Sequence, residues 1–140
     1  MPPDPEALAV AREWVRKADA DLHVAERMAD EAALDLGIRE IVGFHCQQAA
    51  EKYLKALLTS HQADFPKTHD IHVLLELVDQ IDPTAAEAMR EADWLSPFGV
   101  RVRYPGDAPE MLPGDGERAL NLARCVKRVV RSISGVLSEL

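Results

Sequence analysis

Apolar residues recur through the first part of the chain at alternating steps of three and four positions. Six residues share this spacing: Leu8, Ala11, Val15, Ala18, Leu22 and Ala25. The spacing places them on one face of a helix, which is predicted to face a core. Asp4 followed by Pro5 supplies an N-cap and a proline at the first helical position. The pattern predicts a long amphipathic helix continuing to about Ala33, with a break at Gly37.

The same periodicity continues through the middle of the chain. A second helix is predicted from about Ile38 to Gln62, ended by the segment FPK that follows it. Thr68 is predicted to cap a third helix, whose apolar face holds Ile71, Leu74, Leu75 and Val78. A second Asp-Pro pair at residues 82–83 predicts a shorter fourth helix, which fades near Trp94.

The segment from Ser96 to Gly116 holds four of the nine prolines and four of the seven glycines. Regular structure is therefore predicted to be absent from it. Loops of this length are often functional, although a flexible connection explains the composition equally well. A last helix is predicted from near Asp115, with an apolar seam of Leu122, Val126, Val129, Ile133 and Val136. Its other side carries four basic residues that a solvated surface would explain: Arg124, Lys127, Arg128 and Arg131.

These elements predict an all-α protein with a single domain, residues 1–140, built as an antiparallel bundle of four to five helices with one long loop before the last helix. The length of 140 residues, 47% of them hydrophobic, suits one core. No apolar run reaches the roughly 20 residues of a membrane span, and the N-terminus lacks the features of a secretory signal. We therefore expect a cytoplasmic protein without membrane contacts, in which Cys46 and Cys125 are buried free thiols.

The stretch FHCQQAAEKYLKALL, residues 44–58, interrupts an apolar stripe with polar groups. On a helical wheel one arc is apolar or small: Val42, Cys46, Ala49, Ala50, Tyr53, Ala56 and Leu57. The other arc is mixed, because Phe44 and Leu58 adjoin its polar residues: His45, Gln47, Gln48, Glu51, Lys52 and Lys55. A purely solvated face would not need a phenylalanine, so Phe44, Gln48 and Glu51 are predicted to contact a second subunit in a homodimer. The alternative is a wet surface with incidental helix salt bridges.

The formal net charge of −8 disfavours broad binding to nucleic acid, so any anion site must be local. Candidates for binding a nucleotide or another anion are Lys52, Lys55, His69, Arg101, Arg103 and Tyr104. The alternative is that Arg103 pairs with Glu51 or Asp21 across the bundle. His69 and His72 could share a helix face, but a zinc site needs further ligands, so we expect no metal and no cofactor.

Four features together resemble the HEPN-domain family, in its prokaryotic, nucleotidyltransferase-associated type. They are the N-terminal residues Trp14, Ala18, Asp21, Leu22 and Ala25, then FHCQQAAEKYLKALL, then THDIHVLLEL, then RYP at residues 103–105. Any single feature is weak, but their order and spacing are specific, and they span nearly the whole chain. The resemblance implies a helical bundle, a homodimer, and pairing with a minimal nucleotidyltransferase in a toxin-antitoxin-like module.

Some relatives in this family are metal-independent ribonucleases, with an arginine four to six residues before a histidine towards the C-terminal helices. This chain departs from them, because its last histidine is His72. Arg39 and His45 match the spacing, but six helical steps rotate the side chains by roughly 240°. His45 and Arg103 are the remaining weak candidates for catalysis, and only if the loop folds back. We therefore expect a dimeric interaction module, with an RNA-cleaving toxin of altered active site as the alternative.

Overall fold

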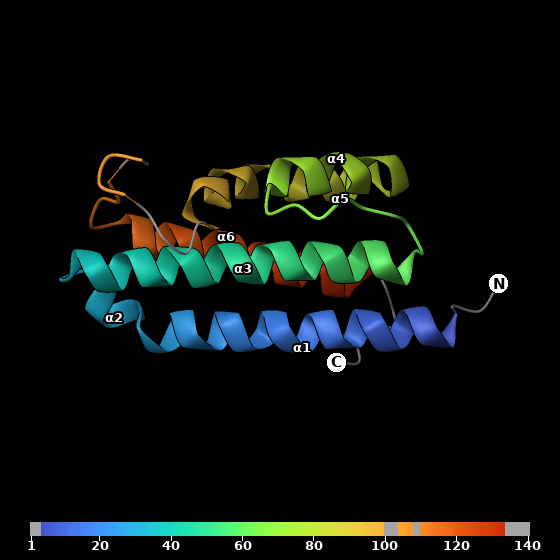
Figure 1. Cartoon of the computed structure of the whole chain (residues 1–140), viewed down its shortest axis with the longest axis horizontal. Helices are drawn as coiled ribbons and strands as arrows, with labels where there is room; N and C mark the ends of the chain where they lie inside the picture. Colours follow the sequence, from blue (N-terminus) through green and yellow to red (C-terminus); the bar gives the residue numbers. More distant parts are fainter. Residues whose placement is uncertain (1–3, 100–103, 108–109, 134–140) are drawn as a thin grey trace.

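The computed structural model describes residues 4–99, 104–107 and 110–133, and all regular structure within them is helical. Figure 1 shows the elements in chain order: α1 (Pro5–Arg27), α2 (Ala29–Ala32), α3 (Leu36–Ser60), α4 (Ile71–Ile81), α5 (Pro83–Ala88), the 3-10 helix η1 (Arg90–Gly99) and α6 (Asp115–Ile133). The predicted all-α fold is confirmed. Arg101, Arg103 and Val136 lie outside the described residues.

Aspartate side chains cap the first turns of four helices. Asp4 accepts from the amide of Ala7, and Asp35, Asp70 and Asp82 do the same at the starts of α3, α4 and α5. Each carboxylate satisfies an amide that has no partner inside its helix. The predicted cap at Thr68 was wrong by two residues, because its hydroxyl accepts from the amide of Asp70 and the helix begins after that residue.

Two predicted helix boundaries differ from the structure. The first helix does not continue to Ala33, because Met28 leaves helical geometry (φ −99°, ψ 1°) and separates α1 from α2. The second helix ends at Ser60, two residues before the predicted Gln62. That glutamine has a positive φ of 54°, the left-handed geometry that commonly stops a helix.

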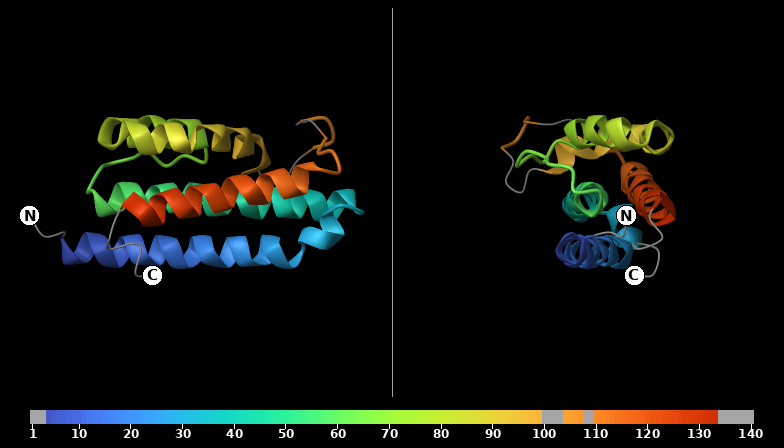
Figure 2. Two further views of the ribbon diagram at one scale, coloured as in Figure 1. Left: turned by 180° about the vertical axis from the view of Figure 1, so that it is seen from behind. Right: turned by 90° about the vertical axis from the view of Figure 1, so that its right-hand side faces the viewer.

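Helix α3 lies at the centre of the bundle, between α1 on one side and the layer of α4, α5 and η1 on the other (Figures 1 and 2). Helix α1 runs antiparallel to α3, as predicted. Helix α4 runs in the same direction as α3, because the segment between them passes back along the bundle. Helix α6 packs against α3 and runs antiparallel to α1, with Gly116 beside Ala32 and Lys127 beside Asp19.

The core between the helices is rich in alanine, which allows the backbones to approach closely. The predicted apolar arc of α3 is buried throughout: Val42, Cys46, Ala49, Ala50, Tyr53, Ala56 and Leu57. Alanines from α1 and α6 meet it, among them Ala11, Ala18, Ala25, Ala119 and Ala123. None of the helices formed by the described residues is long and apolar enough to span a membrane.

The 3-10 helix η1 occupies the place where the fourth helix was expected to fade and the long loop to begin. Helix α5 is short, and η1 continues through Pro97 to Gly99, so the prediction of no regular structure from Ser96 was wrong for the first four residues. Leu95 and Phe98 are buried, which anchors the segment. Trp94 lies edge-on to Phe98 at 4.9 Å, with the guanidinium of Arg118 4.2 Å from its ring centroid.

The basic side of α6 faces helix α1 in part. Lys127 Nζ lies 3.2 Å from an Asp19 carboxylate oxygen, and an Arg124 nitrogen lies 3.8 Å from Glu26. Arg124 remains exposed, as a solvated face predicts, whereas Lys127 is partly covered by its contact with α1.

Candidate functional site

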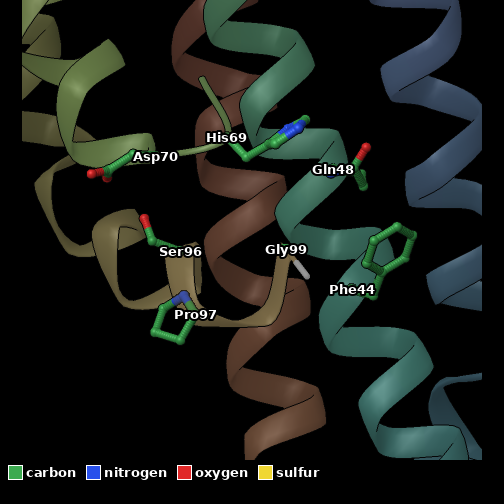
Figure 3. A pocket seen from close by; sticks show the side chains of 7 residues that line it. All are labelled: Phe44, Gln48, His69, Asp70, Ser96, Pro97 and Gly99. Carbon is green, nitrogen blue, oxygen red and sulfur yellow. The ribbon is translucent and has the colours of Figure 1, made fainter. Parts of the chain in front are cut away.

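A groove of about 720 Å³ opens between α3, the residues just before α4, and the end of η1 (Figure 3). Its lining residues are Phe44, Gln48, His69, Asp70, Ser96, Pro97 and Gly99. Figure 3 shows Phe44 and Gln48 on the α3 wall, with the His69 ring extending towards this wall, while Asp70 points away from it. Helix α3 and the capped start of α4 supply two of its walls.

A buried carboxylate supports the groove from inside. Glu51 is only 2% exposed, and one of its oxygens lies 3.0 Å from Lys55 Nζ. The other oxygen lies 2.9 Å from His69 Nδ1 and 3.2 Å from the side-chain nitrogen Nε2 of Gln47. Since a buried charge is costly without partners, these three donors explain how the carboxylate is tolerated.

Lys55 is buried as well, and its ammonium group lies between two aromatic rings. Its Nζ lies 5.4 Å from the Trp14 ring centroid and 5.9 Å from the Phe65 ring centroid. Cation–π contacts of this kind add to the ion pair with Glu51. The predicted interface role of Glu51 therefore needs correction, because this residue is covered by its own chain and offers almost no surface.

The Glu51 carboxylate sets the direction of every hydrogen bond around it. An ionised carboxylate only accepts, so Nδ1 of His69 carries the proton and Nε2 is left as the acceptor in the neutral ring. Gln47 likewise turns its NH₂ towards Glu51 and towards the His69 carbonyl, which lies 2.8 Å away. Its oxygen then accepts from Gln48 Nε2 at 2.8 Å, and this leaves the Gln48 oxygen as an acceptor.

The closeness of η1 to α3 depends on a glycine. A Cβ added at Gly99 would lie 2.4 Å from Gln47 Cδ, well inside the closest normal contact. The Gln47 side chain is held by three hydrogen bonds and cannot move aside freely. Gly99 therefore lets η1 pack against the polar residues of α3, and it forms part of the groove wall.

A second cluster lies on the other side of α3, against α1. Asp21 contacts His45 Nδ1 at 2.9 Å through one oxygen and Lys52 Nζ at 2.5 Å through the other. Nearby, the Tyr53 hydroxyl donates to Asp19, and burial together with this carboxylate raises the tyrosine pKa. Burial also raises the pKa of the Cys46 thiol to about 12. These groups hold α1 against α3.

The structure separates most of the residues predicted to form an anion site. Lys52 pairs with Asp21, Lys55 is buried against Glu51, and only His69 lines the groove. Tyr104 is 75% exposed and does not line the groove. Among the described residues, the groove is lined by no lysine or arginine, and its cation candidates Arg101 and Arg103 lie outside those residues.

Arg39, which matched the ribonuclease spacing with His45, supports the fold instead. Its guanidinium donates to the carbonyls of Ala32, Ala33 and Met111 at 2.8, 3.1 and 2.9 Å. His45 points to Asp21, so the pair is not assembled. No group of three metal-ligating side chains occurs within the part of the chain that the structure describes.

Fold and site together define an all-helical bundle whose central helix presents a groove beside a buried polar network. Residues 11–133 match the family model described as the HEPN domain. The chain belongs to the HEPN family. No match was found among curated proteins or among solved structures.

Proposed function

We propose that this HEPN domain is an interaction module that works in the cytoplasm with a minimal nucleotidyltransferase, in a toxin-antitoxin-like or nucleotide-linked system. The groove beside Phe44 and Gln48 carries the proposal. It is mixed in polarity and flanked by a half-buried aromatic ring, which are features of a protein contact site. The cationic groups nearest to it along α3 are already neutralised by carboxylates, which favours binding of a protein over chemistry on a phosphate.

A homodimer is part of the same proposal. Val24 on α1 is 39% exposed and Ile41 on α3 is 46% exposed. These residues lie about one helical turn from Asp21 and His45, which contact each other across the two helices. An apolar pair beside a partly covered hydrogen bond between Asp21 and His45 is a suitable centre for a self-complementary contact.

Copurification tests the nucleotidyltransferase partner. The chain is expected to retain a minimal nucleotidyltransferase encoded next to it, and Phe44→Asp is expected to abolish retention because it places a charge at the groove. The control is Leu34→Asp, since Leu34 is 91% exposed and does not line the groove. The proposed function would be contradicted if both variants lost the nucleotidyltransferase equally, or if the parent chain did not retain it.

Light scattering during size exclusion tests the homodimer. The parent chain is expected to elute as a dimer at tens of micromolar, roughly the range of a stable interface. Ile41→Asp is expected to give a monomer of unchanged helical content. A parent chain that is monomeric throughout this range removes the homodimer from the proposal.

A further inference from the structure

The groove presents hydrogen-bond acceptors in preference to donors. The Glu51 network consumes the Nδ1 proton of His69 and leaves its Nε2 as an acceptor in the neutral ring. The same network consumes one Gln48 N–H and leaves the Gln48 oxygen free. The Ser96 hydroxyl donates to Asp93 at 3.3 Å, so this proton is also in use. A ligand that supplies N–H donors would therefore fit better than one that supplies acceptors.

The charged residues around the groove also favour a ligand with N–H donors, because they favour a cation over an anion. Asp70 lines it, with its carboxylate turned away from the α3 wall and accepting from the His72 amide, and Asp93 adjoins it through Ser96, 47% exposed and 3.7 Å from His72 Nδ1. No lysine or arginine among the described residues lines it. Among the described residues, a phosphate would meet the His69 and Gln48 acceptors and two nearby carboxylates, whereas a cation would meet complementary charge.

The Phe44 ring supplies the third element of recognition. It stands on the α3 wall next to Gln48 (Figure 3), meets the His45 ring edge-on at 5.2 Å between centroids, and is only half-buried, so part of the ring is exposed to a ligand. Planar cations stack on aromatic faces more readily than a compact ammonium group does. Stacking on Phe44 would bring such a group alongside the acceptors of Gln48 and His69.

We propose that the groove binds an arginine side chain presented by a partner protein. The guanidinium is planar, permanently charged and carries five N–H donors with no acceptor. These properties match the Phe44 ring, the nearby carboxylates of Asp70 and Asp93, and the unused acceptors of His69 and Gln48. This inference rests on the proposed function, because it takes the ligand of the groove to be a partner protein. It adds that the partner must present an arginine side chain to the groove.

The probe is N-acetyl-L-arginine amide, titrated into the isolated chain while signals of Phe44, Gln48 and His69 are followed by NMR. Saturable shifts confined to these residues are expected, with a dissociation constant of roughly millimolar size for a single residue. Gln48→Lys is expected to weaken binding at least about tenfold, because it adds a cation at the groove. The control Glu31→Lys lies on the exposed surface of α2, does not line the groove and alters the net charge more, yet it is expected to change binding less than about twofold.

Several outcomes would overturn the assignment. They are the absence of saturable shifts, equal weakening by Glu31→Lys, or tighter binding of adenosine monophosphate or N-acetyl-L-lysine amide at the same signals. Shifts of these signals when the protein alone is diluted would mean that a second copy covers the groove, which also overturns it. The titration needs no nucleotidyltransferase, so failure to bind arginine and failure to copurify with that partner are separate results.

Discussion

At the scale of single residues, Glu51 joins three side chains of the site. It neutralises Lys55, fixes the ring of His69 and orients Gln47. A group of this kind is stable only when all of its partners are present, because each partner left alone would be a buried charge or an unsatisfied donor. Its removal should therefore affect stability as well as binding.

Glu51→Gln is expected to lower the free energy of unfolding by about 3 kcal/mol, since it leaves the Lys55 ammonium buried without an anion. Urea unfolding measures this. The control is Glu13→Gln, whose partner Arg16 is solvent-exposed, and its midpoint should not move. If both variants unfold at the same urea concentration as the parent, the Glu51–Lys55 pair contributes nothing to the free energy of unfolding.

Stability is expected to fall at alkaline pH. Burial raises the pKa of Cys46 from 9.0 to about 12, and the pKa of Tyr53 is also raised in the folded state. The unfolded chain therefore releases these protons first, and the stabilisation present below pH 9 is lost as the pH rises towards 12. Urea unfolding from pH 8 to pH 11 measures the effect, and Cys46→Ala should reduce the slope. A midpoint that stays constant over this range would contradict the assignment.

At the scale of elements, the sequence predicted the long helices and the buried arc of α3, because their apolar spacing is regular and their aspartate caps are local signals. It did not predict η1, since Pro97 and Gly99 lie in a segment whose composition is typical of a loop. The 3-10 helix is held by Leu95 and Phe98 in the core and by contact with Gln47, which are long-range effects. The composition of residues 96–116 gives no information about contacts with residues far away in the sequence.

Gly99→Ala is expected to destabilise the protein by roughly 1–3 kcal/mol, because the added methyl group would overlap the Gln47 side chain. Thermal or urea unfolding measures it. Gly114→Ala is the matched control, since nothing lies within 4 Å of a Cβ at that position. The contact between η1 and α3 would be looser than described if Gly99→Ala and Gly114→Ala behaved alike.

At the scale of the whole molecule, the sequence identified the family. It predicted Phe44 and Gln48 as dimer contacts, which stays a prediction, and it grouped His69 with lysines that do not line the groove. Only the fold brings residue 69 to residue 51, because the segment between α3 and α4 turns back along the bundle. The spacing of residues in the sequence does not predict that this segment turns back. The lysines expected beside His69 are consumed by nearer carboxylates.

The isolated protein is expected to leave RNA intact, because His45 is held by Asp21 and the arginine-to-histidine motif is not assembled. General acid–base catalysis is worth roughly a hundred- to ten-thousandfold, so little turnover should remain without it. The assay incubates mixed RNA with purified protein in chelator. Strong cleavage by the parent chain that disappears in both His45→Ala and Arg103→Ala would make the ribonuclease alternative the leading function.

The two tryptophans each lie against a different cation, and this gives the molecule two separate optical probes. Trp14 on α1 lies over Lys55, whereas Trp94 on η1 lies under Arg118 of α6. Indole fluorescence responds to a nearby charge, so each emission spectrum should report on its own layer of the bundle. Trp94→Phe would leave a reporter of the α1–α3 contact, and Trp14→Phe a reporter of the η1–α6 contact. Opening of the groove side could then be followed in real time, independently of the rest of the fold.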